Sequence, residues 1–230
     1  MSEIARMVRL GVVADGRLAS AELSALARAA AGAGLGPIWI TDRSPTGPLS
    51  PDQLRVLTEA CEAAGALLAR DCDHTRWAVG GDPPSKLKTP SSHTRPGVVV
   101  PAWPQRSLAE VLRSWRGAGG SPAQLVVEMP VSIGRTRAEA VARSDSWFDA
   151  FGDPATHGLF GSLEDCQDQL AALGDKGLSE LRCILPAADP IDVIAQLSAV
   201  GVGLLRARGP GEIRSTAPAP PPGWGGPPRA

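Results

Sequence analysis

Apolar runs of strand length alternate with helical patterns along this chain, and this alternation constrains its fold more than any other feature. Several of the runs are continuous rather than alternating in polarity, as expected for strands covered on both faces in a parallel sheet. The predicted strands are MVRLGVVA (7–14), PIWIT (37–41), TRWAVG (75–80), GVVVPA (97–102), AQLVVEMPVSI (123–133), LRCILP (181–186) and VGLLRA (202–207).

Helix starts between these runs carry capping residues. A helix predicted over 50–69 opens with Ser50-Pro51-Asp52-Gln53, which combines a capping hydroxyl, a first-turn proline and a glutamine that bonds back. A helix over 20–31 follows from periodicity alone. The helix after Asp189-Pro190 is predicted to bury Ile191, Ile194 and Leu197. The capping spacing recurs at Ser107 and Glu110, at Thr136 and Glu139, and at Ser162 and Asp165.

Strands regularly separated by helices form right-handed βαβ units around a parallel sheet. For 230 residues this favours an α/β fold, a TIM-type (β/α) barrel that is shortened or incomplete. A doubly wound open sheet is the alternative, although the first strand leads into VVADGRLAS without the GxGxxG of a dinucleotide fold. Residues 1–208 are expected to form this barrel domain, and the Pro/Gly-rich residues 209–230 a disordered tail.

The charge balance gives no indication of a polyanionic partner. Lys and Arg number 23 against 24 Asp and Glu, without a basic stripe, so no nucleic-acid partner is expected. Four cysteines lie far apart, and none of the three histidines has a second ligand at metal-binding spacing, so no metal site is expected. With no signal peptide or membrane span in the sequence, a cytoplasmic protein without membrane contact is expected.

Three segments together resemble the luciferase-like monooxygenase family of flavin- and deazaflavin-dependent oxidoreductases. The first, RLGVVADG…ASAELSALARAAAGAGLGPIWITD, is similar to the family's opening strand, helix and second strand ending in an acid. The second, RWAVGGDPP, is similar to a late strand with a double glycine. The third is VSIGRTRAEAVARSD…HGLFGSLEDCQDQLAALGDKGLSELRCILP, and it resembles the closing strands and helices. Their order along the chain, rather than any one segment, carries the resemblance.

The resemblance implies a site at the carboxyl ends of the barrel strands for FMN or a deazaflavin (coenzyme F-420). Asp42 matches the acid after the second strand and would be catalytic together with Arg43, or the two would be an ion pair that ends the strand. Trp39 would line the cofactor or belong to the core. The candidates to hold the cofactor are Gly80, Gly81 and Asp82, which otherwise form a tight turn, and His93, which otherwise is a solvated loop residue.

Two departures leave the function open. About thirty residues join Asp42 to RWAVGG, where the family normally fits two or three more βα units, so this is a shortened member. Arg43 stands where a histidine is usual, and a guanidinium does not exchange protons near neutral pH.

The first hypothesis is an oxidoreductase that uses reduced flavin or deazaflavin for hydride transfer or monooxygenation of a small or peptide-type substrate. The second is a noncatalytic relative, either a cofactor-binding protein or a partner subunit of an active homologue, and as a partner subunit it would need no cofactor. An incomplete barrel also exposes apolar helix faces, so a homodimer or a heterodimer with a homologue is expected.

Glu128 lies inside the apolar run LVVEMPV. A carboxylate there needs either a partner or exposure at a sheet edge, and the sequence leaves both open.

Overall fold

The computed structural model describes residues 8–41, 47–70, 75–77, 83–84, 98–101, 108–121, 124–144, 158–178, 180–185 and 190–201. None of the described helices is long and apolar enough to span a membrane. The strands are β1 (Arg9–Val13), β2 (Ile38–Ile40), β3 (Leu68–Arg70), β4 (Thr75–Arg76), β5 (Val98–Pro101), β6 (Leu125–Ile133), β7 (Leu159–Gly161) and β8 (Glu180–Ile184). The helices are α1 (Ser20–Gly32), α2 (Pro51–Ala64), α3 (Leu108–Gly117), α4 (Arg137–Ala142), α6 (Leu163–Asp175) and α7 (Pro190–Ala199).

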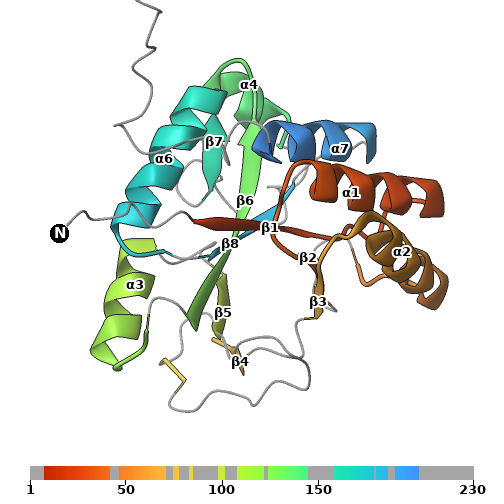
Figure 1. Ribbon diagram of the computed structural model, residues 1–230. Helices are drawn as coiled ribbons and strands as arrows, with labels where there is room; N and C mark the ends of the chain where they lie inside the picture. The colour runs from red at the N-terminus through yellow and green to blue at the C-terminus, as the bar shows by residue number, and fades with distance from the viewer. Residues whose placement is uncertain are drawn as a thin grey trace, which may run out of the picture.

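All the described strand pairings are parallel, and they join the strands in the order β3-β2-β1-β8-β6-β5-β4. The long strand β6 pairs with β8 in its first part and with β7 over Val131–Ile133 (Figure 1). The two ends of the strand order, β3 and β4, are separated in sequence by residues 71–74 alone. Four residues are too few for the crossover helix that normally links neighbouring parallel strands.

Most of the predicted strands are confirmed, and two strands were missed. The run over 202–207 lies outside the described residues. The helix predicted over 50–69 is too long, because Gly65 adopts a left-handed conformation (φ 70°) and ends α2 at Ala64, after which β3 begins. Both β3 and β7 are three residues long, and β7 pairs only with the last part of β6.

Local capping agrees with the predictions at two helices. Ser50 and Gln53 form the reciprocal box at α2, and Ser162 and Asp165 form it at α6. At α4 only half of the box is present. Thr136 accepts from Glu139 N at 3.2 Å, but the Glu139 carboxylate accepts from Arg135 N instead of closing the box. Ser107 lies outside the described residues.

The two faces of the sheet are buried differently. One face packs against α1, α2, α3, α6 and α7 and forms the large core, with residues such as Leu10, Val127 and Leu181 fully buried. The other face forms a second cluster, and among the described residues its one buried helical member is Ala140 of α4. In the described part of the chain the helices therefore lie almost entirely against one face, as they do in the wall of a TIM-type barrel. The members of the second cluster are Val13, Trp39, Ala69, Val99, Val126, Ala140, Phe160 and Ile184.

Of the three core residues predicted for the helix after Pro190, Leu197 is buried, Ile194 is half-buried and Ile191 is 73% exposed. The prediction for Ile191 is wrong, because α7 turns Val193 towards the core.

Candidate functional site

The carboxyl ends of parallel strands meet at one edge of a sheet, which is where the ligands of α/β enzymes usually bind. This edge is called the mouth here, and it comprises the residues that directly follow β1, β2, β6, β7 and β8. Asp15 follows β1 and Thr41 follows β2, and each is only 6% exposed. Buried polar side chains at this edge make it the leading candidate site in the described part of the chain.

Asp15 is held in one orientation by Arg17. Its Oδ1 accepts from Arg17 N at 2.8 Å and from Arg17 Nε at 3.0 Å, and its Oδ2 bonds to the same guanidinium. The backbone bond is an Asx turn, so part of the arrangement is local turn formation. Asp15 was not among the predicted site residues, although an Asp-Gly pair directly follows the first predicted strand in the sequence.

The turn after β1 is fastened to the start of α2. Gln53 Nε2 donates to Gly16 O at 3.0 Å and to Leu18 O at 2.8 Å. A β-carbon on Gly16 would lie 2.7 Å from Gly47 O, so only glycine permits this close approach. The first two βα turns of the mouth are therefore linked by hydrogen bonds.

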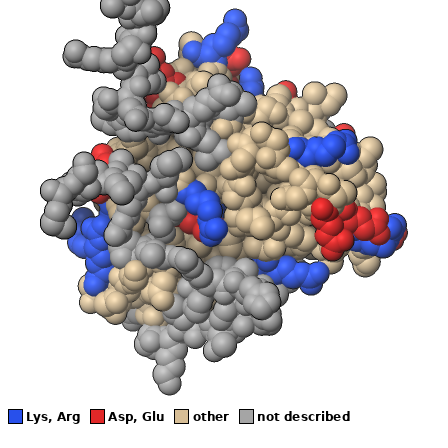
Figure 2. All heavy atoms as spheres, viewed as in Figure 1, with Lys and Arg blue, Asp and Glu red and all other residues tan. Residues whose placement is uncertain are grey.

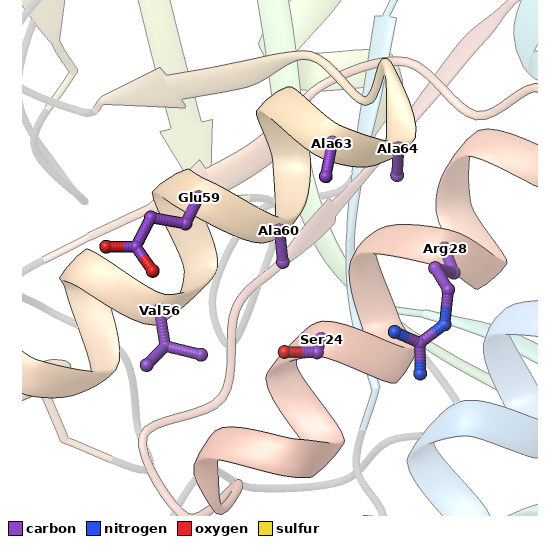
Figure 3. Close-up of a pocket in the computed structure, with 7 residues that line it drawn as sticks. All are labelled: Ser24, Arg28, Val56, Glu59, Ala60, Ala63 and Ala64. Carbon is purple, nitrogen blue, oxygen red and sulfur yellow. The ribbon is translucent and has the colours of Figure 1, made fainter.

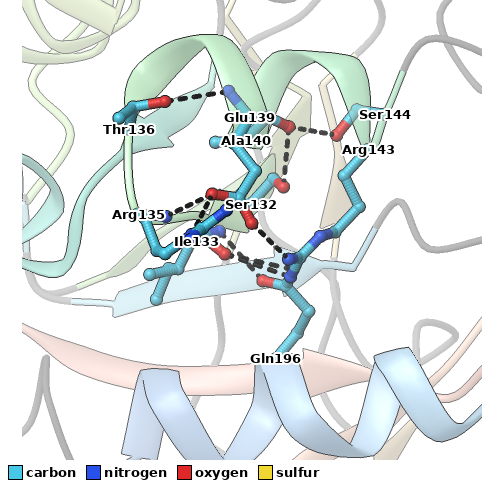
Figure 4. A network of polar contacts seen from close by, with 9 residues as sticks. All are labelled: Ser132, Ile133, Arg135, Thr136, Glu139, Ala140, Arg143, Ser144 and Gln196. Atoms are coloured by element: carbon cyan, nitrogen blue, oxygen red, sulfur yellow. Dashed lines mark hydrogen bonds and ion pairs between the residues drawn. The ribbon is translucent and has the colours of Figure 1, made fainter.

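A buried polar network fixes the end of β6 under α4 (Figure 4). Gln196 of α7 accepts from Ile133 N at 2.9 Å and donates to Ile133 O at 3.4 Å, so its amide acts as a short strand partner. Ser132 and Ser144 both donate to Ala140 O, at 2.9 and 3.1 Å. Both the N–H and the C=O of Ile133, at the end of β6, therefore have a hydrogen-bond partner.

Arginines gather where β6 and β7 end. Arg135 extends into solvent, with its side chain 92% exposed, and bonds to Glu139 at 3.1 Å. Arg137 Nη1 donates to Phe160 O at 3.0 Å and so joins α4 to β7. Arg135 and Arg143 share the Glu139 carboxylate, so charges of both signs stand on this side of the mouth. Arg135 and Arg137 are the groups there whose chemistry suits an anionic group such as a phosphate.

Beneath the mouth, a row of polar and aromatic side chains crosses the inner face. Arg182 of β8 is fully buried and lies in register with Gly11 of β1 and Glu128 of β6. Its Nη1 is 3.2 Å from Glu128 Oε2, and its guanidinium carbon lies 4.6 Å from the centre of the Trp39 ring. Glu128 therefore has a partner and is not exposed at a sheet edge: the residue is 4% exposed, and its carboxylate faces the buried guanidinium of Arg182.

Asp165 and Cys166 at the start of α6, and Cys183 in β8, have structural roles. Hydrogen bonds from Ser162, first from its backbone N–H and then from its hydroxyl, lower the pKa of Asp165. Burial raises the pKa of the Cys166 thiol to about 11 and that of Cys183 to about 12. Such thiols are not nucleophilic near neutral pH. Among the described residues, no group of three or more His, Cys, Asp or Glu side chains is positioned to hold a metal ion.

Of the predicted site residues, Trp39 alone lies in the described part of the chain. It is 1% exposed, belongs to the inner cluster, and has Arg182 against one face of its ring. Thr41, which follows β2, is the last described residue before Asp42. The remaining predicted site residues, Asp42, Arg43, Gly80, Gly81, Asp82 and His93, lie outside the described residues.

A shallow groove of about 350 Å³ lies on the outer side of the molecule, between α1 and α2 (Figure 3). Its walls are helix surfaces, so it is separate from the mouth. The lining residues are Ser24, Arg28, Val56, Glu59, Ala60, Ala63 and Ala64.

Several solved structures share this fold. One is apo-MsnO8, at 16% identity and a TM-score of 0.56 over 86% of this chain and 99% of that chain. Another is the monooxygenase RslO1 from Streptomyces bottropensis, at 9% identity and a TM-score of 0.59 over 86% of this chain and 99% of that chain. A third is an F420-dependent secondary alcohol dehydrogenase in complex with an F420–acetone adduct, at 10% identity and a TM-score of 0.55 over 85% of this chain and 99% of that chain. At these identities the likeness shows the fold. No family model and no curated protein matches the chain.

Proposed function

We propose that this chain is a shortened luciferase-like oxidoreductase that binds a reduced flavin or deazaflavin at the mouth. The observation that carries the proposal is the mouth itself, where buried Asp15 and Thr41 and the arginines after β6 stand at one edge of a sheet. The fold shared with a monooxygenase and an F420-dependent dehydrogenase supports this assignment.

The described residues suit such a cofactor in their chemistry. Val13 and Ile184, at the ends of β1 and β8, and Phe160 in β7 are buried on the inner face, which provides an apolar floor for a flat ring. Arg135 and Arg137 would hold a phosphate or another anionic group of the cofactor. When bound, the ring supplies the hydride or the activated oxygen, and the protein supplies position and the exclusion of water.

The roles of individual residues follow from their placement. Asp15 would keep Arg17 in place at the rim, where the guanidinium can face an anionic substrate. The Thr41 hydroxyl would hydrogen-bond to a polar edge of the ring or of the substrate. Asp42 and Arg43 follow Thr41 directly in the sequence, and in this proposal they act on the substrate.

The alternative is a noncatalytic relative that binds the cofactor, or supports an active homologue, without turnover. The short connection between β3 and β4 favours it, because a βα unit that would add a further loop to the mouth has no room there. The same purified protein separates the two functions, since only the enzyme oxidises or reduces a bound ring in the presence of substrate.

Titration of the purified chain with reduced FMN and with reduced F-420, followed by fluorescence, tests the proposal. We expect binding at micromolar concentrations, weakened about tenfold or more by the Arg135→Ala/Arg137→Ala double variant, because a charge-assisted bond contributes roughly 1.5–3 kcal/mol. Arg113→Ala, on the exposed surface of α3, is the matched control and should bind like the wild type. Absence of binding by both cofactors would overturn the proposal.

A further inference from the structure

A buried ion pair lies one layer below the floor of the mouth, on the inner face of the sheet. Arg182 and Glu128 are both buried, and Arg182 Nη1 lies 3.2 Å from Glu128 Oε2. Side chains alternate between the two faces of β8, so Arg182 shares the inner face with Ile184, whereas Leu181 and Cys183 belong to the core on the other face. The pair therefore lies directly beneath an apolar residue of the proposed floor, roughly 6.6 Å further down the strand.

Stability alone does not account for a charged pair at this depth. Taking two charges out of water often costs more than their attraction returns, and apolar residues of similar size can pack as stably in their place. The pairs Arg9–Glu180 and Arg17–Asp15, by contrast, each keep the guanidinium in contact with water, with arginine side chains 58% and 35% exposed. The Arg182–Glu128 pair is therefore the one of these three whose placement points to an electrostatic role.

Burial preserves the electric field of this pair. The charged atoms visible in Figure 2 lie at the surface, where water and dissolved ions screen them. Charges in the interior are screened far less, so they act on any group that is seated nearby.

The two charges come from different strands. In the strand order β2-β1-β8-β6, Glu128 lies on the β6 side of Arg182, and the Trp39 ring approaches from the opposite side across β1. The guanidinium carbon lies 4.6 Å from the centre of that ring, in a cation–π contact that fixes the positive charge. The floor residues Val13 and Ile184 belong to β1 and β8, the strands beside the guanidinium, whereas the carboxylate comes from β6.

We propose that the Arg182–Glu128 pair sets the reduction potential of a flavin bound at the mouth, with Arg182 favouring the reduced form. This inference rests on the proposed function. Reduction near neutral pH adds two electrons and one proton to the neutral oxidised ring, so the reduced ring carries one negative charge. A buried cation below the floor stabilises that charge, and Glu128 offsets part of the effect. Trp39 is a positioning residue, because its ring holds the guanidinium in place.

Anaerobic titration of the full chain loaded with FMN measures this potential, with dithionite as the reductant and a dye of known potential as the reference. We expect Glu128→Gln to increase the equilibrium constant for reduction about tenfold, because Arg182 loses its counter-charge; for a two-electron couple this is about 30 mV. Arg182→Gln should decrease the constant by a similar factor, because the carboxylate then acts alone. Loss of packing by itself gives no reason for shifts of opposite sign.

Two further variants keep the test decisive if Arg182→Gln does not fold. The double variant Arg182→Met/Glu128→Leu removes both charges, so its potential should lie below that of Glu128→Gln. Leu23→Ala, at a fully buried position of α1 on the other face, leaves a cavity without altering any charge and should not shift the potential. Circular dichroism confirms that each variant is folded.

Unshifted potentials in folded, FMN-loaded variants would overturn the inference, and so would shifts of Glu128→Gln and Arg182→Gln in the same direction. Either result leaves the proposed function standing, because the cofactor is still bound. A chain that binds F-420 but not FMN also overturns this inference alone. A chain that binds neither overturns the proposed function, and this inference with it.

Discussion

A β-carbon on Gly11 would lie 2.6 Å from Nε1 of Trp39, so the indole occupies the space that a larger residue in β1 would need. The Trp39 ring thereby passes over β1 and reaches Arg182 in β8. Because Gly11 has no side chain, Trp39 of β2 can cross β1 and contact Arg182 of β8, which connects three strands on the inner face.

Gly11→Ala is expected to lower the free energy of unfolding by about 1–3 kcal/mol, because the methyl group would also lie 2.8 Å from Pro37 O and the backbone must shift. Urea denaturation measures the loss. Gly32→Ala is the control, since a β-carbon there has nothing within 4 Å. Equal stability of Gly11→Ala and the wild type would contradict the packing described.

Arg182→Met is expected to destabilise the protein by about 3–5 kcal/mol, because it leaves Glu128 as a buried carboxylate without its cationic partner. Adding Glu128→Leu should recover part of this loss, since both charges are then removed together. A double-mutant cycle of urea unfolding curves gives the coupling energy. Strictly additive losses would show that the two side chains do not interact.

Gln196→Ala should cost about 1–3 kcal/mol, because the N–H and C=O of Ile133 each lose a buried hydrogen bond. Hydrogen exchange of the Ile133 amide should accelerate in the same variant. Ser198→Ala, at an exposed position of α7, serves as the comparison and should change neither quantity.

The buried thiols should not react with a disulfide reagent at pH 8 while the protein is folded. Burial raises the pKa of Cys166 to about 11 and that of Cys183 to about 12, so the thiolate fraction is very small at that pH. A Cys72→Ser background restricts the assay to Cys61, Cys166 and Cys183, all of which are buried. Rapid labelling in native buffer would contradict this prediction, whereas labelling in denaturant is expected.

The Asp165 cap should make stability depend on pH. Because Ser162 lowers the pKa of the folded carboxyl, the contribution is fully present above the unfolded-state pKa and is lost as pH falls through the folded-state value. Asp165→Asn should therefore differ from the wild type at neutral pH and converge with it in acid. Parallel stability curves for the two proteins across this range would disprove the assignment.

Features set by neighbouring residues in the sequence could be predicted. The boxes at Ser50 and Ser162 join side chains to backbone three residues away, so the spacing alone indicates them. Thr136 shows the limit, because Arg135 competes for the Glu139 carboxylate and the box stays half formed.

Features set by strand register could not be predicted. Arg182 and Glu128 are far apart in sequence and meet only because β8 pairs with β6 in one register. The short strands β3 and β7 carry too few residues to show a period. Asp15 was missed because an Asp-Gly pair after a strand is most simply interpreted as a turn.

The four residues between β3 and β4 set an upper limit on the width of the sheet. With neighbouring strands about 4.8 Å apart, a flat sheet in the observed order would separate these two strands by roughly 29 Å. The extended chain from Arg70 to Thr75 reaches only about 18 Å. The shortest link in the sheet therefore forces it to bend, and lengthening that link with flexible residues would release the constraint without touching any packed side chain.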